Sequence, residues 1–145
     1  MTKLRLFALL LAFAPALGLA ASAGPLESSG TDLSDRASLQ RGAGLYMNYC
    51  AGCHALSLHR YSRIAEDLGL SPELVEQNLM PANAKIGENI NTGINTGDGN
   101  AWFGKAAPDL SLIARAKLGG PDYVYSYIKG FYIDESRPLG WNNTV

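Results

Sequence analysis

The sequence predicts a mainly α-helical domain with long loops. Several segments repeat apolar residues at the spacing of an amphipathic helix, whereas no segment shows the convincing alternation of a half-buried strand. The chain has 145 residues, and an export signal at its start leaves about 120 of them, which is the length of one domain. No internal repeat or low-complexity tract divides this domain.

Residues 1–23 have the pattern of a secretory signal peptide. Lys3 and Arg5 form a basic start, the apolar run Leu6–Ala21 follows, and Ala21-Ser22-Ala23 supplies a cleavage site of small residues. The apolar run is short for a transmembrane helix, which needs about 20 residues, although a membrane anchor is the alternative interpretation. We therefore expect the protein to be exported.

Removal of this signal makes the chain mildly acidic. The whole sequence has 12 basic and 13 acidic residues, and the signal contains two basic residues and no acidic ones, which leaves 10 against 13, or a net charge of −3. This charge argues against nucleic acid as a partner. It is compatible with a basic protein partner, because complementary charge speeds association.

The domain is predicted to span residues 35–145 and to begin with a helix over 35–49, after a flexible leader at 24–34 that is rich in Gly, Ser and Pro. Ser34 or Asp35 can cap the first N–H groups of this helix. One apolar face recurs at helical spacing and consists of Leu39, Gly42, Ala43, Tyr46 and Met47. The small and aromatic residues on this face are expected to let a second helix cross closely.

Cys50-Ala51-Gly52-Cys53-His54 follows this helix directly and has the C-x-x-C-H pattern of c-type haem attachment. Each thiol can bond one vinyl group of the porphyrin, and His54 can coordinate the iron as its proximal ligand. A redox dithiol and half of a zinc site are the alternatives. A zinc site would need two further ligands, and His59 is the only other histidine. The motif therefore predicts one covalent haem c, attached through Cys50 and Cys53.

Two segments after the motif favour short helices, and a third favours a loop. Residues 61–70 are typical of a short helix or turn, and Ser71-Pro72-Glu73 begins another helix with proline at its first position. Residues 87–104 contain five glycines and several Asn and Asp residues, which predicts a long irregular loop.

Two helices are expected in the last third of the chain. One is predicted to start at Ala107-Pro108-Asp109-Leu110, and the other to cover 122–131. Tyr123, Tyr127 and Ile128 are expected to be buried on the second of these helices.

Five stretches occur in order and together resemble the cytochrome c1 family: RGAGLYMNYCAGCH, HRYSRIAEDLGLS, WFGKAAPDLSLIARAK, GGPDYVYSYIKGFY and RPLGWNN. The resemblance runs from about residue 35 to the end of the sequence. It implies a cytochrome c-like helical domain around one covalent haem. It also implies the haem subunit of the bacterial ubiquinol–cytochrome c oxidoreductase, the cytochrome bc1 complex, on the periplasmic side of the inner membrane.

The resemblance implies four more residues of the haem pocket. Pro108 comes from a segment that packs against the haem in the family, and Tyr123 is a candidate for lining the pocket. The family supplies an Arg to a haem propionate from this region, and that position is Lys117 here, with Arg115 beside it. Lysine can pair with a carboxylate but lacks the bidentate fork of arginine. A solvated helix face is the alternative for these basic residues.

The distal iron ligand departs from the family pattern. Cytochromes of this kind pair His with Met, and in the family that Met lies downstream of the segment that is Arg137–Asn143 here. Because the sequence ends at Val145, we expect the distal Met, a closing C-terminal helix and a C-terminal membrane anchor to be missing from it. Met80 is a candidate distal ligand within the sequence. Met47 is expected in the core, and His59 follows the proximal histidine too closely to reach the opposite face of the iron.

Two kinds of function are compatible with these observations. The first is an electron-transfer subunit that takes electrons from the Rieske iron–sulfur protein, passes them to a soluble c-type cytochrome, and associates with cytochrome b and the membrane. Such a subunit transforms no substrate, so it is not a complete enzyme alone. The second is a fragment with an open five-coordinate haem that binds gases or has weak peroxidase activity. A fragment without independent function is a further alternative, and we expect the haem-free chain to be disordered.

Overall fold

The computed structural model describes residues 25–145 and is mainly helical, as the sequence predicts. The predicted signal peptide at 1–23 lies outside the described residues. Six helices occur in the described part of the chain: α2 (Arg36–Tyr49), α3 (Tyr61–Leu68), α4 (Pro72–Leu79), α5 (Thr96–Phe103), α6 (Ile113–Ala116) and α7 (Pro121–Lys129). None of them is both long enough and apolar enough to cross a membrane.

The predicted starts of α2 and α4 are confirmed, because both are capped by the expected side chains. The Asp35 carboxylate accepts a hydrogen bond from the Ser38 amide at 2.9 Å. The Ser71 hydroxyl accepts one from the Leu74 amide at 3.3 Å, and Pro72 occupies the first turn of α4. Each cap satisfies one of the N–H groups that a helix leaves without an internal partner.

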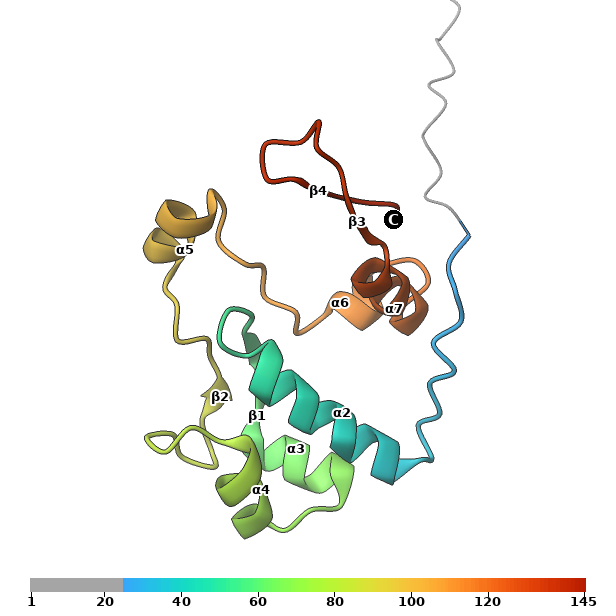
Figure 1. Ribbon diagram of the computed structural model, residues 1–145. Coiled ribbons are helices and arrows are strands. Elements are labelled where there is room, and N and C mark those ends of the chain that lie inside the picture. The colour runs from blue at the N-terminus through green and yellow to red at the C-terminus, as the bar shows by residue number, and fades with distance from the viewer. Residues whose placement is uncertain (1–24) are drawn as a thin grey trace, which may run out of the picture.

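The buried core lies where α2, α3 and α4 meet in the lower half of Figure 1. Its buried members are Tyr61, Ala65, Val75, Leu79 and Ile90. Ala43, Tyr46 and Met47, from the predicted apolar face of α2, pack against this cluster. The core therefore fixes the carboxyl end of α2, from which the C-x-x-C-H motif leaves.

Two antiparallel strand pairs were not expected from the sequence. β1 (Leu56–Arg60) pairs with β2 (Asn89–Ile90), and β3 (Phe131–Ile133) pairs with β4 (Trp141–Asn143) as a hairpin. The strands have two to five residues each, too short for an alternating pattern to be visible in the sequence. The β1–β2 pair matters for the site, because it continues directly from the motif.

Three predictions about later elements are wrong in part. Residues 87–104 are not an irregular loop throughout, because they contain β2 and α5. The helix expected from 107–110 begins only at Ile113 and is a single turn. The helix predicted over 122–131 is present as α7, but Tyr127 and Ile128 on it are exposed, and its one buried side chain is Ser126.

The segment expected to be a flexible leader runs extended beside α7 (Figure 1). The Glu27 amide donates to the Ser126 hydroxyl at 2.8 Å, and the Ser29 amide and hydroxyl donate to the Asp122 carboxylate at 2.7 and 2.8 Å. Lys129 forms an ion pair with Glu27. These contacts join the start of the described chain to its last helix.

Candidate haem site

The C-x-x-C-H motif forms a turn immediately after α2. The Cys50 amide still donates to the Tyr46 carbonyl at 2.8 Å, and the His54 amide donates to the Cys50 carbonyl at 2.8 Å. Both cysteines are free thiols, Cys50 being half-buried and Cys53 exposed. The turn thus presents two unpaired thiols and an imidazole at the end of an anchored helix.

The His54 ring is oriented by the carbonyl of Pro108, whose oxygen lies 2.8 Å from Nδ1. A carbonyl oxygen can only accept a hydrogen bond, so Nδ1 must carry the ring proton. The lone pair is then on Nε2, which is the form in which a neutral imidazole binds a metal. This contact assigns the tautomer and the direction of the ligand from protein atoms alone.

The Pro108 segment is itself held against β1 by Asp109. One carboxylate oxygen accepts from the Ser57 amide and hydroxyl at 3.0 and 2.5 Å, and the other accepts from the Ser111 amide at 2.7 Å. Hydrogen bonds with the side chains of Ser111 and Ser57 hold the pKa of Asp109 well below its usual range. Asp109 is therefore ionised at neutral pH and accepts hydrogen bonds through both oxygens.

Two further hydroxyls hold the attachment turn. The Tyr46 hydroxyl donates to the His54 carbonyl at 2.6 Å, and burial raises the pKa of Tyr46 to about 12. The Thr92 hydroxyl donates to the Gly52 carbonyl at 2.7 Å and so ties the β2–α5 connection to the middle of the motif. The motif is thus fixed from the helix before it and from a segment 40 positions later.

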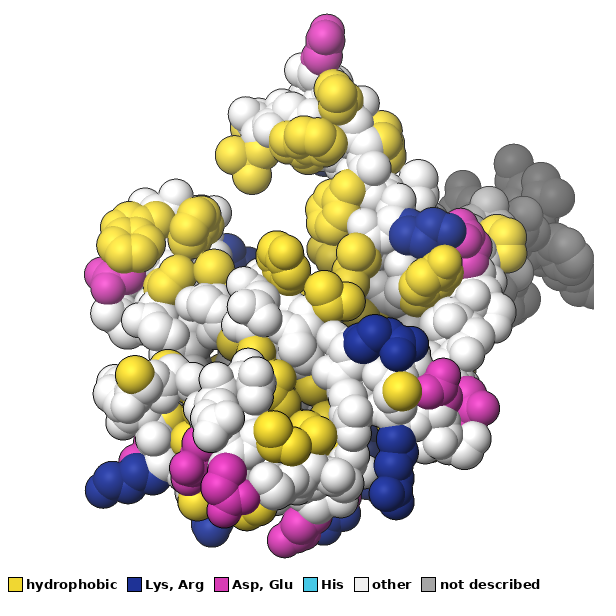
Figure 2. Space-filling model, turned by 60° about the horizontal axis from the view of Figure 1, so that its bottom comes forward, with side chains coloured by type: hydrophobic (Ala, Val, Ile, Leu, Met, Phe, Trp, Pro, Cys, Tyr) yellow, Lys and Arg dark blue, Asp and Glu magenta, His cyan; other side chains and the backbone are white. Residues whose placement is uncertain are grey.

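The surroundings suit a large apolar group. Figure 2 shows hydrophobic side chains on several sides of an open gap between α5, the β3–β4 hairpin and the α6–α7 region. The exposed hydrophobic side chains of these elements include Trp102, Phe103, Tyr127, Phe131, Ile133 and Trp141. Such a concentration of exposed apolar surface is typical of a site that something else covers. Together with two thiols and an oriented imidazole, it fits a covalently held porphyrin.

The structure brings some of the predicted pocket residues together. Lys117 places its ammonium 5.0 Å from the ring centroid of Tyr123, and Tyr123 stacks on Tyr127 with centroids 6.0 Å apart. Arg115 lies on α6 and is exposed. Pro108 contacts His54 as described. The contacts of these residues with a haem stay predictions.

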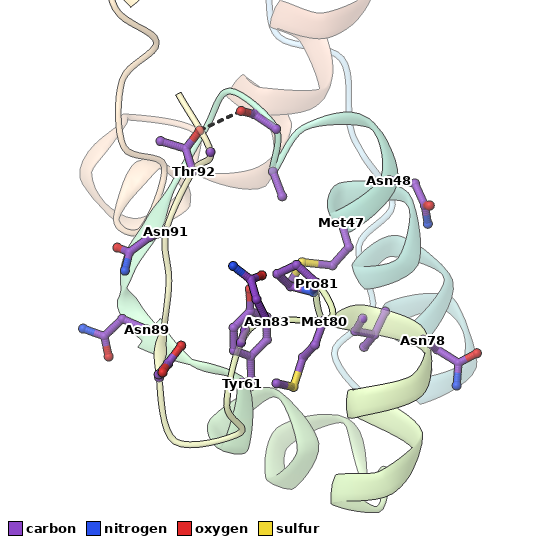
Figure 3. Close-up of a pocket in the computed structure, with 16 residues that line it drawn as sticks. Met47, Asn48, Tyr61, Asn78, Met80, Pro81, Asn83, Asn89, Asn91 and Thr92 are labelled. Atoms are coloured by element: carbon purple, nitrogen blue, oxygen red, sulfur yellow. Dashed lines mark hydrogen bonds between the residues drawn. The ribbon is translucent and has the colours of Figure 1, made fainter. Parts of the chain in front are cut away.

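Met80 ends α4 and lines a different part of the molecule. It borders a cavity of about 560 Å³ together with Met47, Tyr61 and the Ala51–Gly52 part of the motif. Figure 3 shows both methionine side chains pointing into this cavity, Met47 from above the level of the Tyr61 ring and Met80 beside the ring. His54 does not line it, and Cys53 lines a smaller cavity with Thr92 and Phe103. The assignment of Met80 as distal ligand stays a prediction.

Met47 and His59, the other candidates for the distal ligand, each contact protein groups in the structure. Met47 packs against the core cluster, as expected. His59 uses Nε2 for a contact with the Ser111 carbonyl at 3.1 Å. That contact keeps the His59 ring beside Ser111, at the junction of β1 with the segment before α6.

Sequence reasoning missed Asp109 and Thr92 as residues of the site. Both act through hydrogen bonds to segments distant in the sequence, and neither sits in a periodic pattern or next to the motif. The only local signal was the Pro-Asp pair at 108–109, which the sequence pattern assigned to a helix start.

The fold and the site define the class: a mainly helical domain with a c-type haem attachment motif. A profile of the Cytochrome C1 family matches residues 28–101 and 95–143 of this chain, which covers most of it. The chain therefore belongs to the cytochrome C1 family, whose members carry one covalent haem c.

Two of the three relatives described next are cytochromes c1. Cytochrome c1 of Allochromatium vinosum is 47% identical over all of this chain and 59% of its own length. The ammonia monooxygenase gamma subunit of Nitrosomonas europaea is 37% identical over 83% of this chain, and cytochrome c1 of Rhodospirillum rubrum is 29% identical over 74%. The chain spans 59%, 50% and 46% of the length of these three relatives.

Proposed function

We propose that this protein is the haem-bearing electron-transfer subunit of a ubiquinol–cytochrome c oxidoreductase, facing the periplasm of a bacterial inner membrane. It accepts an electron from the Rieske iron–sulfur protein and passes it to a soluble c-type cytochrome. Membership of the cytochrome C1 family supports the class of function. The partners and the export of the chain belong to the proposal.

One observation carries the proposal: the 2.8 Å contact between His54 Nδ1 and the Pro108 carbonyl. It leaves Nε2 of a neutral imidazole free beside two free thiols, which is the arrangement that a covalently attached iron porphyrin requires. A thiol–disulfide redox site does not require a histidine fixed in this tautomer.

The bound haem supplies one-electron chemistry, because its iron alternates between the ferrous and ferric states. The protein supplies the rest. Cys50 and Cys53 provide the thioether anchors, and His54 Nε2 provides the proximal ligand. The exposed hydrophobic side chains around the gap exclude water, and Lys117 offers a positive charge to a propionate. None of these groups acts as an acid, a base or a nucleophile toward a substrate.

The proposal assigns the distal position to a methionine, either Met80 or a residue outside this sequence. Haem with histidine and methionine ligands has a high reduction potential and resists carbon monoxide, whereas a five-coordinate haem binds it readily. Carbon monoxide titration of the reduced, haem-loaded chain separates these states. A Met80→Leu variant that binds no more carbon monoxide than the original chain would exclude Met80.

Electron transfer tests the function directly. The chain is expressed with haem attachment, reduced, and mixed with an oxidised basic c-type cytochrome in a stopped-flow spectrometer. We expect rapid transfer that slows as ionic strength rises, because the mature chain carries a net charge of −3 once Lys3 and Arg5 are removed from the 12 basic and 13 acidic residues. A haem-loaded chain that binds carbon monoxide fully and transfers no electrons would contradict the proposal and support the open-haem alternative.

A further inference from the structure

The segment that orients His54 is bound to β1 through Ser111 and Asp109. The Ser111 hydroxyl accepts from the Leu58 amide, and the Ser111 carbonyl contacts His59 Nε2, both at 3.1 Å. Closer to Pro108, the link is the Asp109 side chain. Its two carboxylate oxygens accept hydrogen bonds on opposite sides of the junction. One accepts from the amide and hydroxyl of Ser57, three residues after His54, and the other accepts from the Ser111 amide in its own segment. A carboxylate that accepts several short hydrogen bonds holds its neighbours more firmly than neutral pairs do.

Of the residues that bind this segment to β1, Asp109 is the one adjacent to Pro108. Pro108 lies between the end of α5 at Phe103 and the start of α6 at Ile113, where no regular element holds the backbone. Proline has no N–H, so Pro108 cannot anchor itself through its own amide. The nearest backbone contact is the Leu110 amide, which donates to the Ala55 carbonyl at 2.9 Å. The position of the Pro108 carbonyl therefore depends on the residues that follow it, of which Asp109 is the first.

The hydrogen bond at His54 Nδ1 affects Nε2 of the same ring, which is the atom that would bind the iron. An acceptor at Nδ1 draws the proton outward and raises the basicity of Nε2. A more basic ligand donates more charge to the iron and favours the ferric state, which lowers the reduction potential. Any change in the distance or angle of the Pro108 carbonyl is thus transmitted to the redox equilibrium.

We propose that Asp109 is a positioning residue for His54: its carboxylate holds the Pro108 carbonyl against Nδ1 and thereby sets the reduction potential of the haem. This inference rests on the proposed haem function of the same site. Asp109 does not touch the ligand ring through any contact in the structure, so it acts through the geometry of residues 108–111. The inference adds a residue outside the attachment motif that tunes the electron carrier.

The test compares Asp109→Asn with Asp122→Asn in the haem-loaded full chain. Asparagine keeps the size of the side chain but replaces one acceptor oxygen by a donor group, which cannot accept from Ser57 or Ser111. Asp122 is a matched control, because it also accepts from the amide and hydroxyl of one serine, Ser29, but at the leader contact with α7.

We expect Asp109→Asn to shift the one-electron equilibrium at least threefold toward ferrous haem, which is about 28 mV at 59 mV per tenfold change. Solvent exchange of the His54 Nδ1 proton, followed by NMR, should become faster in the same variant. Asp122→Asn should change neither quantity. An unchanged potential and exchange rate in a haem-loaded Asp109→Asn protein would overturn the inference while leaving the proposed function intact.

A second variant covers the case in which Asp109→Asn fails to fold. Ser57→Ala removes only the hydroxyl contact of Asp109 and keeps the amide contact. It should raise the potential and speed the proton exchange in the same direction by a smaller factor. A folded Ser57→Ala protein without either change would overturn the inference. If the original chain takes up no covalent haem, the proposed function fails first, and haem staining on a denaturing gel shows which of the two has failed.

Discussion

At the scale of single residues, Tyr46 shows how the attachment turn is held from within α2. Its hydroxyl reaches over eight positions to the His54 carbonyl at 2.6 Å, and its ring packs against the core. Removing the hydroxyl leaves this carbonyl without that partner but keeps the packing. Tyr46 therefore couples the core to the histidine that follows the two thiols.

We expect Tyr46→Phe to lower the free energy of unfolding by about 1 kcal/mol, the typical contribution of one such hydrogen bond. Urea unfolding of the haem-loaded chain measures it. Tyr49→Phe is the matched control, because Tyr49 lies on the same helix and is 81% exposed, so the change should be near zero. Equal effects of the two substitutions would argue against a role for the contact.

Lys117 is predicted, from the family resemblance, to stand where an arginine meets a haem propionate. If its ammonium pairs with a haem propionate, Lys117→Ala removes a positive charge near the iron and stabilises the ferric state. A pair worth roughly 0.7 kcal/mol corresponds to a fall of about 30 mV in the midpoint potential. Potentiometric titration of Lys117→Ala beside Arg115→Ala checks this. An equal fall in both variants would indicate a general charge effect and no specific contact.

At the scale of elements, the leader and α7 form a pair whose contact depends on charge. Hydrogen bonds from the Ser29 amide and hydroxyl lower the pKa of Asp122 below its ordinary value of 3.8. A carboxylate whose pKa is lowered in the folded state stabilises that state above about pH 4, and the contribution is lost as the pH falls through this range. The Ser29 part of the leader should therefore be released from Asp122 in acid.

Hydrogen exchange of the Ser29 amide, corrected for its intrinsic pH dependence, measures this release. Protection should fall below about pH 4 in the original chain. It should already be weak at neutral pH in Asp122→Asn and unchanged in Asp98→Asn, whose carboxylate lies on α5. The same acid midpoint in all three proteins would assign the release to another group.

The elements that the sequence predicts well are those with local signals. Asp35 and Ser71 cap α2 and α4 in the structure because a cap needs only residues within one turn. The start of α6 was predicted too early because Asp109, a good capping residue, binds Ser57 on β1. α5 was missed because its sequence is rich in glycine, and the helix is bounded by the Asn95 cap and by Gly104 in the left-handed conformation.

At the scale of the whole molecule, the hydrophobic core is small for the chain. Six hydrophobic side chains are buried in the described part, whereas seventeen large ones are exposed, many of them on α5, α7 and the β3–β4 hairpin. An attached porphyrin would cover part of this surface and add the apolar contacts that a core of this size lacks. Haem attachment and folding should therefore be coupled.

The Cys50→Ala/Cys53→Ala double variant, which cannot form a thioether, tests this coupling. We expect it to lose haem staining on a denaturing gel, to lose helical circular dichroism, and to be digested by protease at least tenfold faster than the haem-loaded chain. The original chain produced without haem is the control for the substitutions, and it should behave like the variant. A haem-free chain with full helicity and protease resistance would show that the fold does not need the cofactor.

In the candidate site, as in the fold, the features with local sequence signals could be predicted and the long-range contacts could not. Cys50, Cys53 and His54 could be predicted as site residues because they belong to a motif of five consecutive residues. The contact of His54 with Pro108 was not, because it joins residues 54 positions apart through a backbone carbonyl. Partners of this kind depend on tertiary placement, which neither spacing nor composition reports.

The leader contact has a consequence for the order in which the chain folds. The core cluster and both of its strands lie within residues 36–90, whereas the leader bonds to α7 across 93 and 99 positions. Contacts between distant positions have the larger entropic cost of loop closure and therefore form late. A growing chain also begins to fold from its N-terminus. The attachment turn is thus accessible while the opposite wall of the gap, on α7 and the β3–β4 hairpin, is still unassembled. A bulky planar cofactor can then reach both thiols before the leader secures α7.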